Sequence, residues 1–254
     1  MPALNAGFIG VSDMVRLKGV LITRLAFFLS LSVISQTSLA NVVVGATRII
    51  YPELQKEVTV KLSNNEGSPV LAQTWIDKGD VNAQPEKLQV PFIIMPPINR
   101  IDAGKSQTLR ITYTGSSTLP SNKETAFWLN VLEIPPVGKN RSPNKLQIAF
   151  RTRIKLFYRP ESLGKADKAI AAAESLEWAS MGKTIIAKNN SPFYVSLVSV
   201  SDGSGHSVEG EMVPPFGETT FTPSSSMKFS PGAKVSYEYV NDWGAVKSIN
   251  KNVK

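Results

Sequence analysis

A chain of 254 residues has room for one or two domains, and 42% hydrophobic content suits a folded protein and excludes one with several membrane spans. The net charge of +8 is spread along the sequence without clustered or aromatic-interleaved basic residues, so we expect no nucleic-acid partner. Cysteine is absent and His206 is the one histidine, which excludes disulfides and thiolate metal sites and argues against an enzyme, a metal or a cofactor.

The first 40 residues have the features of a secretory signal peptide. Arg16, Lys18 and Arg24 supply a basic region, residues 25–34 are apolar, and residues 38–40 are Ser-Leu-Ala, the small-residue pattern that precedes a cleavage site. The apolar stretch is too short for a bilayer, which needs about 20 residues. It therefore predicts export without stable membrane insertion.

Cleavage is expected between Ala40 and Asn41, so that Asn41 begins a mature protein outside the cytoplasm. Residues 1–13 precede a second plausible start at Met14.

The chain from Val42 to Pro160 reads as short strands separated by turn residues. Trp75 is expected to anchor the core, and Leu109, Ile111 and Tyr113 are expected to share one face of their strand. Strands of this length and spacing predict an all-β sandwich. The expected strands in this half are 58–62, 70–76, 89–95, 107–113 and 126–134.

The longest predicted strand spans residues 146–160, more than twice the usual length of roughly 5–6 residues. Its even-numbered residues share one apolar face, interrupted by Thr152, and the opposite face is basic. A strand this long is expected to extend beyond its sheet and to offer an uncovered edge to a strand of another chain. A long core strand is the alternative that the pattern leaves open. The apolar residues are Leu146, Ile148, Phe150, Ile154, Leu156 and Tyr158, and the basic ones are Arg151, Arg153 and Lys155.

The composition changes after Pro160. Residues 161–177 are interpreted as a linker with enough alanine for a helical turn or two, and a second β domain follows. The predicted organisation is therefore a signal peptide at 1–40, a first domain at 41–160, and a second domain with its linker at 161–254. The expected strands of the second domain are 176–178, 183–187, 193–200, 218–221 and 234–240.

Residues 119–136, LPSNKETAFWLNVLEIPP, resemble the signature of the periplasmic pilus-assembly chaperones, the PapD-like family, at all eighteen positions. Three more stretches fit the same family: 45–52 (GATRIIYP), 153–160 (RIKLFYRP) and 240–244 (VNDWG). The resemblance implies two immunoglobulin-like β-sandwich domains set at an angle, with a cleft between them, in a periplasmic protein.

The resemblance also implies a mode of action. Family members bind pilin subunits that lack their last strand and lend the long strand of the first domain to complete them. By motif position, Arg48 and Lys155 would hold the C-terminal carboxylate of the subunit. The donated side chains would be those of Leu146, Ile148 and Phe150.

Two further features follow from the family. An interdomain ionic cluster maps onto Glu124, Arg159 and Asp242, and an outer-membrane usher is an expected second partner. The loop at 137–145 is short, as in the branch of the family that serves rod-like pili of several subunit types.

Simpler interpretations exist for several of these residues. Arg48 and Lys155 taken alone would be solvated surface charges. Arg151 and Arg153 are expected to be solvated. All four tryptophans are expected to pack in the cores or between the domains; they are Trp75, Trp128, Trp178 and Trp243.

A second class of function is a secreted structural or adhesive component of a fibre. A pilin of that kind needs an alternating donor segment at its own mature N-terminus. Residues 41–45, NVVVG, are too short for this and do not alternate, which favours the chaperone.

Overall fold

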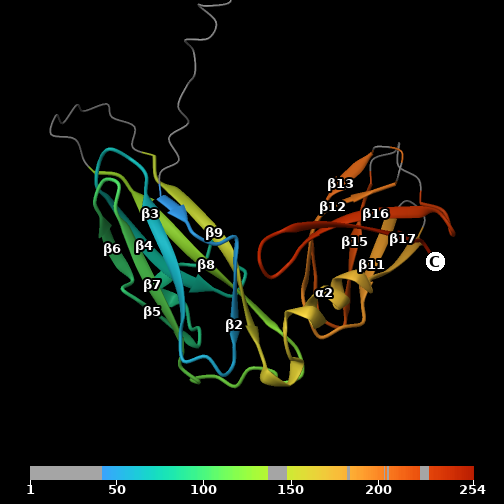
Figure 1. The fold of residues 1–254 in the computed structure, drawn as a ribbon, viewed down its shortest axis with the longest axis horizontal. Coiled ribbons are helices and arrows are strands. Elements are labelled where there is room, and N and C mark those ends of the chain that lie inside the picture. Colours follow the sequence, from blue (N-terminus) through green and yellow to red (C-terminus); the bar gives the residue numbers. More distant parts are fainter. Residues whose placement is uncertain (1–41, 137–147, 182–183, 203, 205, 224–228) are drawn as a thin grey trace, which may run out of the picture. The chain divides into compact units, whose positions relative to one another are not determined.

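The computed structural model describes residues 42–136, 148–181, 184–202, 204, 206–223 and 229–254. The predicted signal peptide, its cleavage site at Ala40 and Asn41, the 137–145 loop and Leu146 lie outside these residues. Figure 1 shows two all-β domains along the chain, the first in blue to yellow and the second in gold to red. The predicted all-β class with two immunoglobulin-like domains is confirmed.

The first domain is a sandwich of a five-stranded and a four-stranded sheet. Neighbouring strands are antiparallel except β2 and β9, which are parallel. The first sheet has the order β2 (Arg48–Pro52), β9 (Phe150–Arg159), β8 (Thr125–Ile134), β4 (Val70–Asp77) and β6 (Ile98–Ile101). The second has the order β1 (Val42–Val44), β3 (Val58–Asn64), β7 (Ser106–Tyr113) and β5 (Phe92–Met95), and a short 3-10 helix, η1 (Pro85–Lys87), precedes β5.

Alternation of apolar residues along the strands builds the core of this domain. Leu109 and Ile111 are fully buried, as predicted, and Tyr113 is partly buried. The prediction for Trp75 was wrong, because Ala72, Thr74 and Ile76 occupy the inward positions of β4 and leave the indole half-buried on the outer face. The sequence pattern missed β6 and did not single out β2 as a strand.

The long strand begins later than predicted. Ile148 and Ala149 are not part of it, and its first residue, Phe150, pairs with Glu133 near the end of β8. Pro135 and Pro136 follow β8 and have no N–H to donate to a continued ladder, and among the described residues the pairing of β8 with β9 ends here.

The second domain has sheets of its own around a separate core, in which Trp178 is 1% exposed. One sheet has the order β10 (Glu177–Met181), β11 (Thr184–Asn189) and β15 (Gly217–Phe221). The other has the order β13 (Ser207–Glu209), β12 (Val195–Ser201), β16 (Lys234–Val240) and β17 (Val246–Asn252), with β14 (Met212–Val213) also paired to β12.

The segment between the domains contains the 3-10 helix η2 (Glu161–Leu163) and the helix α2 (Ala166–Glu174), which is longer than the one or two turns expected. The sequence pattern missed β17, an edge strand with mostly exposed residues, and the very short β13 and β14. None of the helices in the described ranges is both long and apolar enough to cross a membrane.

Candidate functional site

Arg48 and Lys155 lie side by side. The parallel register of β2 and β9 pairs their Cα atoms, so the two cations occupy neighbouring positions on one face of the sheet. Both are partly buried by the second domain: Arg48 Nη1 donates to the Val240 carbonyl oxygen at 2.7 Å, and Lys155 Nζ donates to Ser196 Oγ at 3.3 Å.

The environment of this pair suits an anion. Burial lowers the pKa of Arg48, although the carboxylates of Asp242 and Glu124 oppose the shift. Burial also lowers the pKa of Lys155, and the positive charge of Arg48 lowers it further.

Among the described residues, neither cation forms an ion pair with a carboxylate, and the buried Arg48 Nε has no hydrogen-bond partner. A guanidinium and a neighbouring ammonium can together bind a carboxylate through charge-assisted hydrogen bonds.

Aromatic rings also lie beside Arg48, where the first domain contacts the second. The Arg48 guanidinium lies 6.0 Å from the centroid of the Phe157 ring, and that ring lies 5.6 Å from the ring of Tyr194 in the second domain. At this distance the face of the Phe157 ring adds a weak attraction for the Arg48 charge.

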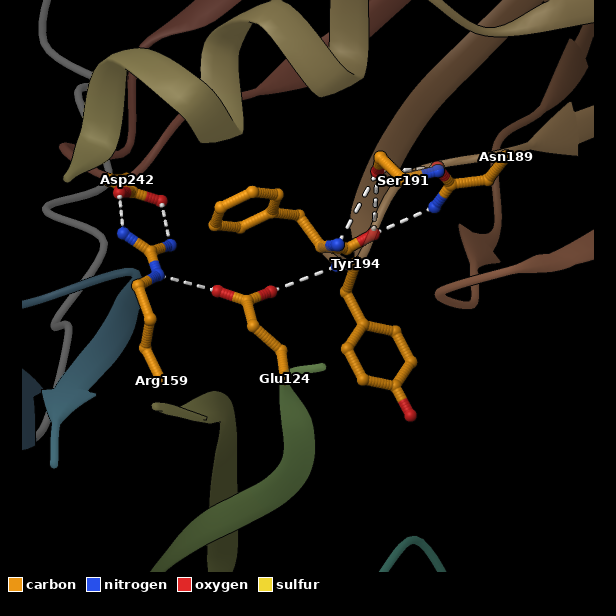
Figure 2. Close-up of polar contacts among 7 residues, drawn as sticks. Glu124, Arg159, Asn189, Ser191, Tyr194 and Asp242 are labelled. Atoms are coloured by element: carbon orange, nitrogen blue, oxygen red, sulfur yellow. Dashed lines mark hydrogen bonds and ion pairs between the residues drawn. The ribbon is translucent and has the colours of Figure 1, made fainter. Parts of the chain in front are cut away.

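An ionic cluster centred on Arg159 joins the two domains, as Figure 2 shows. Arg159 Nε donates to Glu124 Oε1 at 2.7 Å, while its Nη1 and Nη2 donate to the two carboxylate oxygens of Asp242 at 2.6 and 3.0 Å. The second oxygen of Glu124 accepts the Tyr194 N–H at 2.9 Å, and the guanidinium lies 5.2 Å from the centroid of the Phe193 ring. The structure thus brings together the three residues expected to form this cluster.

The charges in the cluster are not equally compensated. Burial lowers the pKa of Arg159, but the two carboxylates outweigh it, so its pKa is raised. Burial raises the pKa of Glu124, and Arg159 offsets this only in part. Both pKa values are therefore raised, which favours the charged form of Arg159 and disfavours that of Glu124. For Glu124 burial is the main cause, and repulsion from Asp242 adds a smaller contribution.

The two halves of β9 have different neighbours. Residues 155–158 lie between β8 and β2, and Arg159 pairs with β2, whereas residues 150–154 pair with β8 only. In the described part of the chain, this half therefore has an open edge with unpaired backbone groups. Phe150 is 57% exposed and the preceding Ile148 is 55% exposed.

Two expectations about side chains were wrong. Arg153 is not fully solvated, because its guanidinium binds the buried carboxylate of Asp77. Arg151 is exposed, as expected, and its Nη1 donates to the Val81 carbonyl oxygen at 2.9 Å. Trp243 is 71% exposed and so is not a packing residue. Nothing in the spacing of Asp77 marked it as a partner of the long strand.

Comparisons with known proteins agree in both domains. Residues 41–164 match the family described as "Pili and flagellar-assembly chaperone, PapD N-terminal domain", and residues 171–251 match "Pili assembly chaperone PapD, C-terminal domain". The chaperone protein MrkB of Klebsiella pneumoniae is 41% identical over 217 residues, which cover 84% of this chain and 92% of MrkB.

Solved structures show the same relationship. The SafB chaperone of Salmonella enterica, solved in complex with the SafA pilin, is 28% identical with a TM-score of 0.72, covering 86% of this chain and 99% of that one. The periplasmic chaperone SfaE is 32% identical with a TM-score of 0.66, covering 84% and 100%. This chain belongs to the PapD family of pilus-assembly chaperones.

Proposed function

We propose that this protein is a periplasmic chaperone that captures pilin subunits by donor-strand complementation and delivers them for pilus assembly without ATP. The observation that carries the proposal is the open edge of β9 at residues 150–154, which leads directly to the paired cations Arg48 and Lys155. The complex of the SafB chaperone with the SafA pilin supports a pilin as the partner.

Capture begins with an extended strand of the subunit. Its backbone pairs with the open edge of β9, and Ile148 and Phe150 enter the apolar groove that the subunit's missing strand leaves bare. Leu146, known only from the sequence, is proposed as the third donated residue.

The terminal carboxylate of the subunit sets the register. Bound between Arg48 and Lys155, it fixes where the subunit strand begins along β9. A slip of one residue would turn every donated side chain away from the groove, so the anchor also selects which residues are donated.

The compartment and the second partner belong to the same proposal. The signal-peptide features of residues 1–40 and the periplasmic relative SfaE support export, and N-terminal sequencing of the exported protein should read Asn-Val-Val-Val from Asn41. The usher and the rod-like class of pilus are proposed from the family resemblance and from the short 137–145 loop.

A fibre component is the weaker alternative. Val42–Val44 form β1, which pairs antiparallel with β3 of the same domain. A pilin would need its N-terminal segment free for another subunit, so this use of the segment favours the chaperone.

The test is backbone amide exchange in the isolated chaperone and in its complex with a pilin subunit of the same bacterium. Residues 150–154 should exchange faster than residues 155–159 in the free protein and become protected in the complex. A complex that leaves residues 150–154 unprotected would rule out strand pairing at this edge.

A further inference from the structure

The outer face of the first domain carries a polar clamp between β4 and the open half of β9. Asp77, the last residue of β4, is 1% exposed, and its two carboxylate oxygens accept from Arg153 Nη2 at 2.5 Å and Nε at 3.1 Å. The contact passes over β8, whose Asn130 donates to the same carboxylate through Nδ2 at 2.6 Å. We call Asp77, Asn130 and Arg153 the β9 clamp.

Local packing holds the clamp in one geometry. The guanidinium of Arg153 lies 4.7 Å from the centroid of the Trp128 ring, and the Gly79 N–H donates to Asp77 Oδ1 at 2.6 Å. Gly79 has a φ of +119°, and a Cβ there would lie 3.3 Å from the Trp128 ring, so the turn after β4 requires glycine.

The carboxylate of Asp77 has its acceptors filled. Burial raises the pKa of Asp77, but the hydrogen bonds from Arg153, Asn130 and Gly79 outweigh this, so the pKa lies below its usual value. The group is therefore ionised throughout the neutral range and keeps its attraction for Arg153.

The position of the clamp is what suggests a role. Arg153 belongs to the half of β9 that has no β2 strand beside it, and the clamp ties this half across β8 to β4. An exposed bond from Arg151 to the Val81 carbonyl oxygen, in the loop after β4, lies beside it. An edge strand held by one neighbour opens more readily than a strand held by two, and each opening loses the extended shape that a partner strand must meet.

Resting on the proposed function, we propose that Asp77 is a positioning residue, which through Arg153 holds the open half of β9 extended and ready for the subunit strand. Its contact with Arg153 lies on the face opposite the donated side chains, so it can remain in place while a subunit is bound.

Amide exchange of the free protein tests the clamp without any subunit. Asp77→Asn keeps the shape of the side chain and removes its charge. Exchange at residues 150–154 should accelerate by about tenfold to a hundredfold, while the amides of β3 and β7 in the opposite sheet change little. Equal acceleration in both sheets, or none at residues 150–154, would overturn the proposal.

A matched control is available in the same domain. Asp102 forms an ion pair with Arg100 Nε at 3.0 Å, but both side chains are about two-thirds exposed. Asp102→Asn should therefore leave exchange at residues 150–154 as in the wild type. Acceleration as large as that of Asp77→Asn would show that loss of an aspartate charge alone is the cause.

A double mutant identifies the route of the effect. If Asp77 acts through Arg153, then Asp77→Asn combined with Arg153→Met should open residues 150–154 no more than the stronger single variant does. If the two substitutions instead multiply each other's effect on exchange at residues 150–154, the clamp is contradicted.

The consequence for capture is measured separately. Titration with a pilin subunit of the same bacterium should show affinity about tenfold lower for Asp77→Asn than for the wild type and unchanged for Asp102→Asn. If the wild type binds no subunit, the proposed function fails, while the exchange result still decides the clamp. If the wild type and Asp77→Asn bind equally well, the positioning role is refuted.

Discussion

The two halves of β9 share one pattern of alternating apolar residues but differ in how exposed those residues are. In residues 155–159 the apolar positions are sealed in the core, with Leu156 at 0% and Tyr158 at 3% exposure. In residues 150–154 the first apolar position, Phe150, is more than half exposed. Ile154, next to the other half, is buried, so exposure increases toward the N-terminal end of the strand. The two halves also differ in their neighbours, because β2 flanks residues 155–159 only.

The comparison indicates where function is built. The half with two neighbours carries the groups that need a rigid support, Lys155 and Arg159, both in contact with the second domain. The half with one neighbour carries the backbone edge and the uncovered apolar side chain, which are the features a partner strand can use. In the proposed mechanism residues 155–159 anchor the subunit, and residues 150–154 provide the edge at which the donated strand pairs with it.

The largest expected effect is a loss of stability, caused by a substitution in residues 155–159 of β9. Arg159→Ala leaves the buried carboxylate of Glu124 without its cation, and breaking a buried ion pair in this way costs about 3–5 kcal/mol. Thermal melting should show a clear loss of stability.

The matched control is Arg100→Ala, whose pair with Asp102 is exposed and contributes under about 1 kcal/mol. Equal melting curves for the two variants would show that the Arg159 cluster does not hold the fold together.

The next largest effect is on capture of a subunit, through the donated side chain of Ile148. Ile148→Asp should leave circular dichroism and melting unchanged, because this side chain is 55% exposed and lies outside the strand. Capture of a subunit should fall by about a hundredfold or more, since a charge in an apolar groove is costly.

Ile98→Asp is the control, because Ile98 is similarly exposed on β6 and far from β9 in the order of the sheet. An unfolded Ile148→Asp variant would mean that the side chain serves the chaperone's own core.

The anchor is expected to contribute a smaller amount. A hydrogen bond to a charged group contributes about 1.5–3 kcal/mol, so Arg48→Ala or Lys155→Ala should each weaken capture by roughly ten- to a hundredfold. Lys61→Ala, an exposed lysine on β3, should have no effect. Calorimetric titration of a subunit gives the comparison, and affinities unchanged in both anchor variants would refute the site.

The smallest effect is the dependence of capture on pH. Burial and Arg48 lower the pKa of Lys155 in the free protein, and a bound carboxylate favours the ammonium form and raises it again. Affinity should therefore be constant below the lowered pKa and fall as the pH rises through it. Lys155→Ala should lose this dependence, and a dependence that persists in the variant would point to another group.

Much of this arrangement was accessible from the sequence. Alternation predicted the long strand and its exposed first half, and the resemblance of motifs pointed to Arg48 and Lys155, which the parallel register of β2 and β9 places side by side. Periodicity reports which residues share a face, and it carries no information on which strand lies beside them.

The incorrect predictions for Arg153, Trp75 and the first residue of β9 have the same origin. Arg153 was expected to be solvated because its partner, Asp77, lies two strands away and 76 residues earlier in the chain. Trp75 was expected in the core, although the alternation along β4 places it on the outer face. The N-terminal limit of β9 depends on where its partner β8 meets two prolines.

The most direct test uses two synthetic peptides with the C-terminal sequence of a pilin subunit from the same bacterium, one with a free carboxylate and one amidated. The chaperone should bind the free peptide at least roughly ten- to a hundredfold more tightly, and the double variant Arg48→Ala, Lys155→Ala should bind the two alike. Equal affinity of the wild-type chaperone for the two peptides would contradict carboxylate anchoring at Arg48 and Lys155.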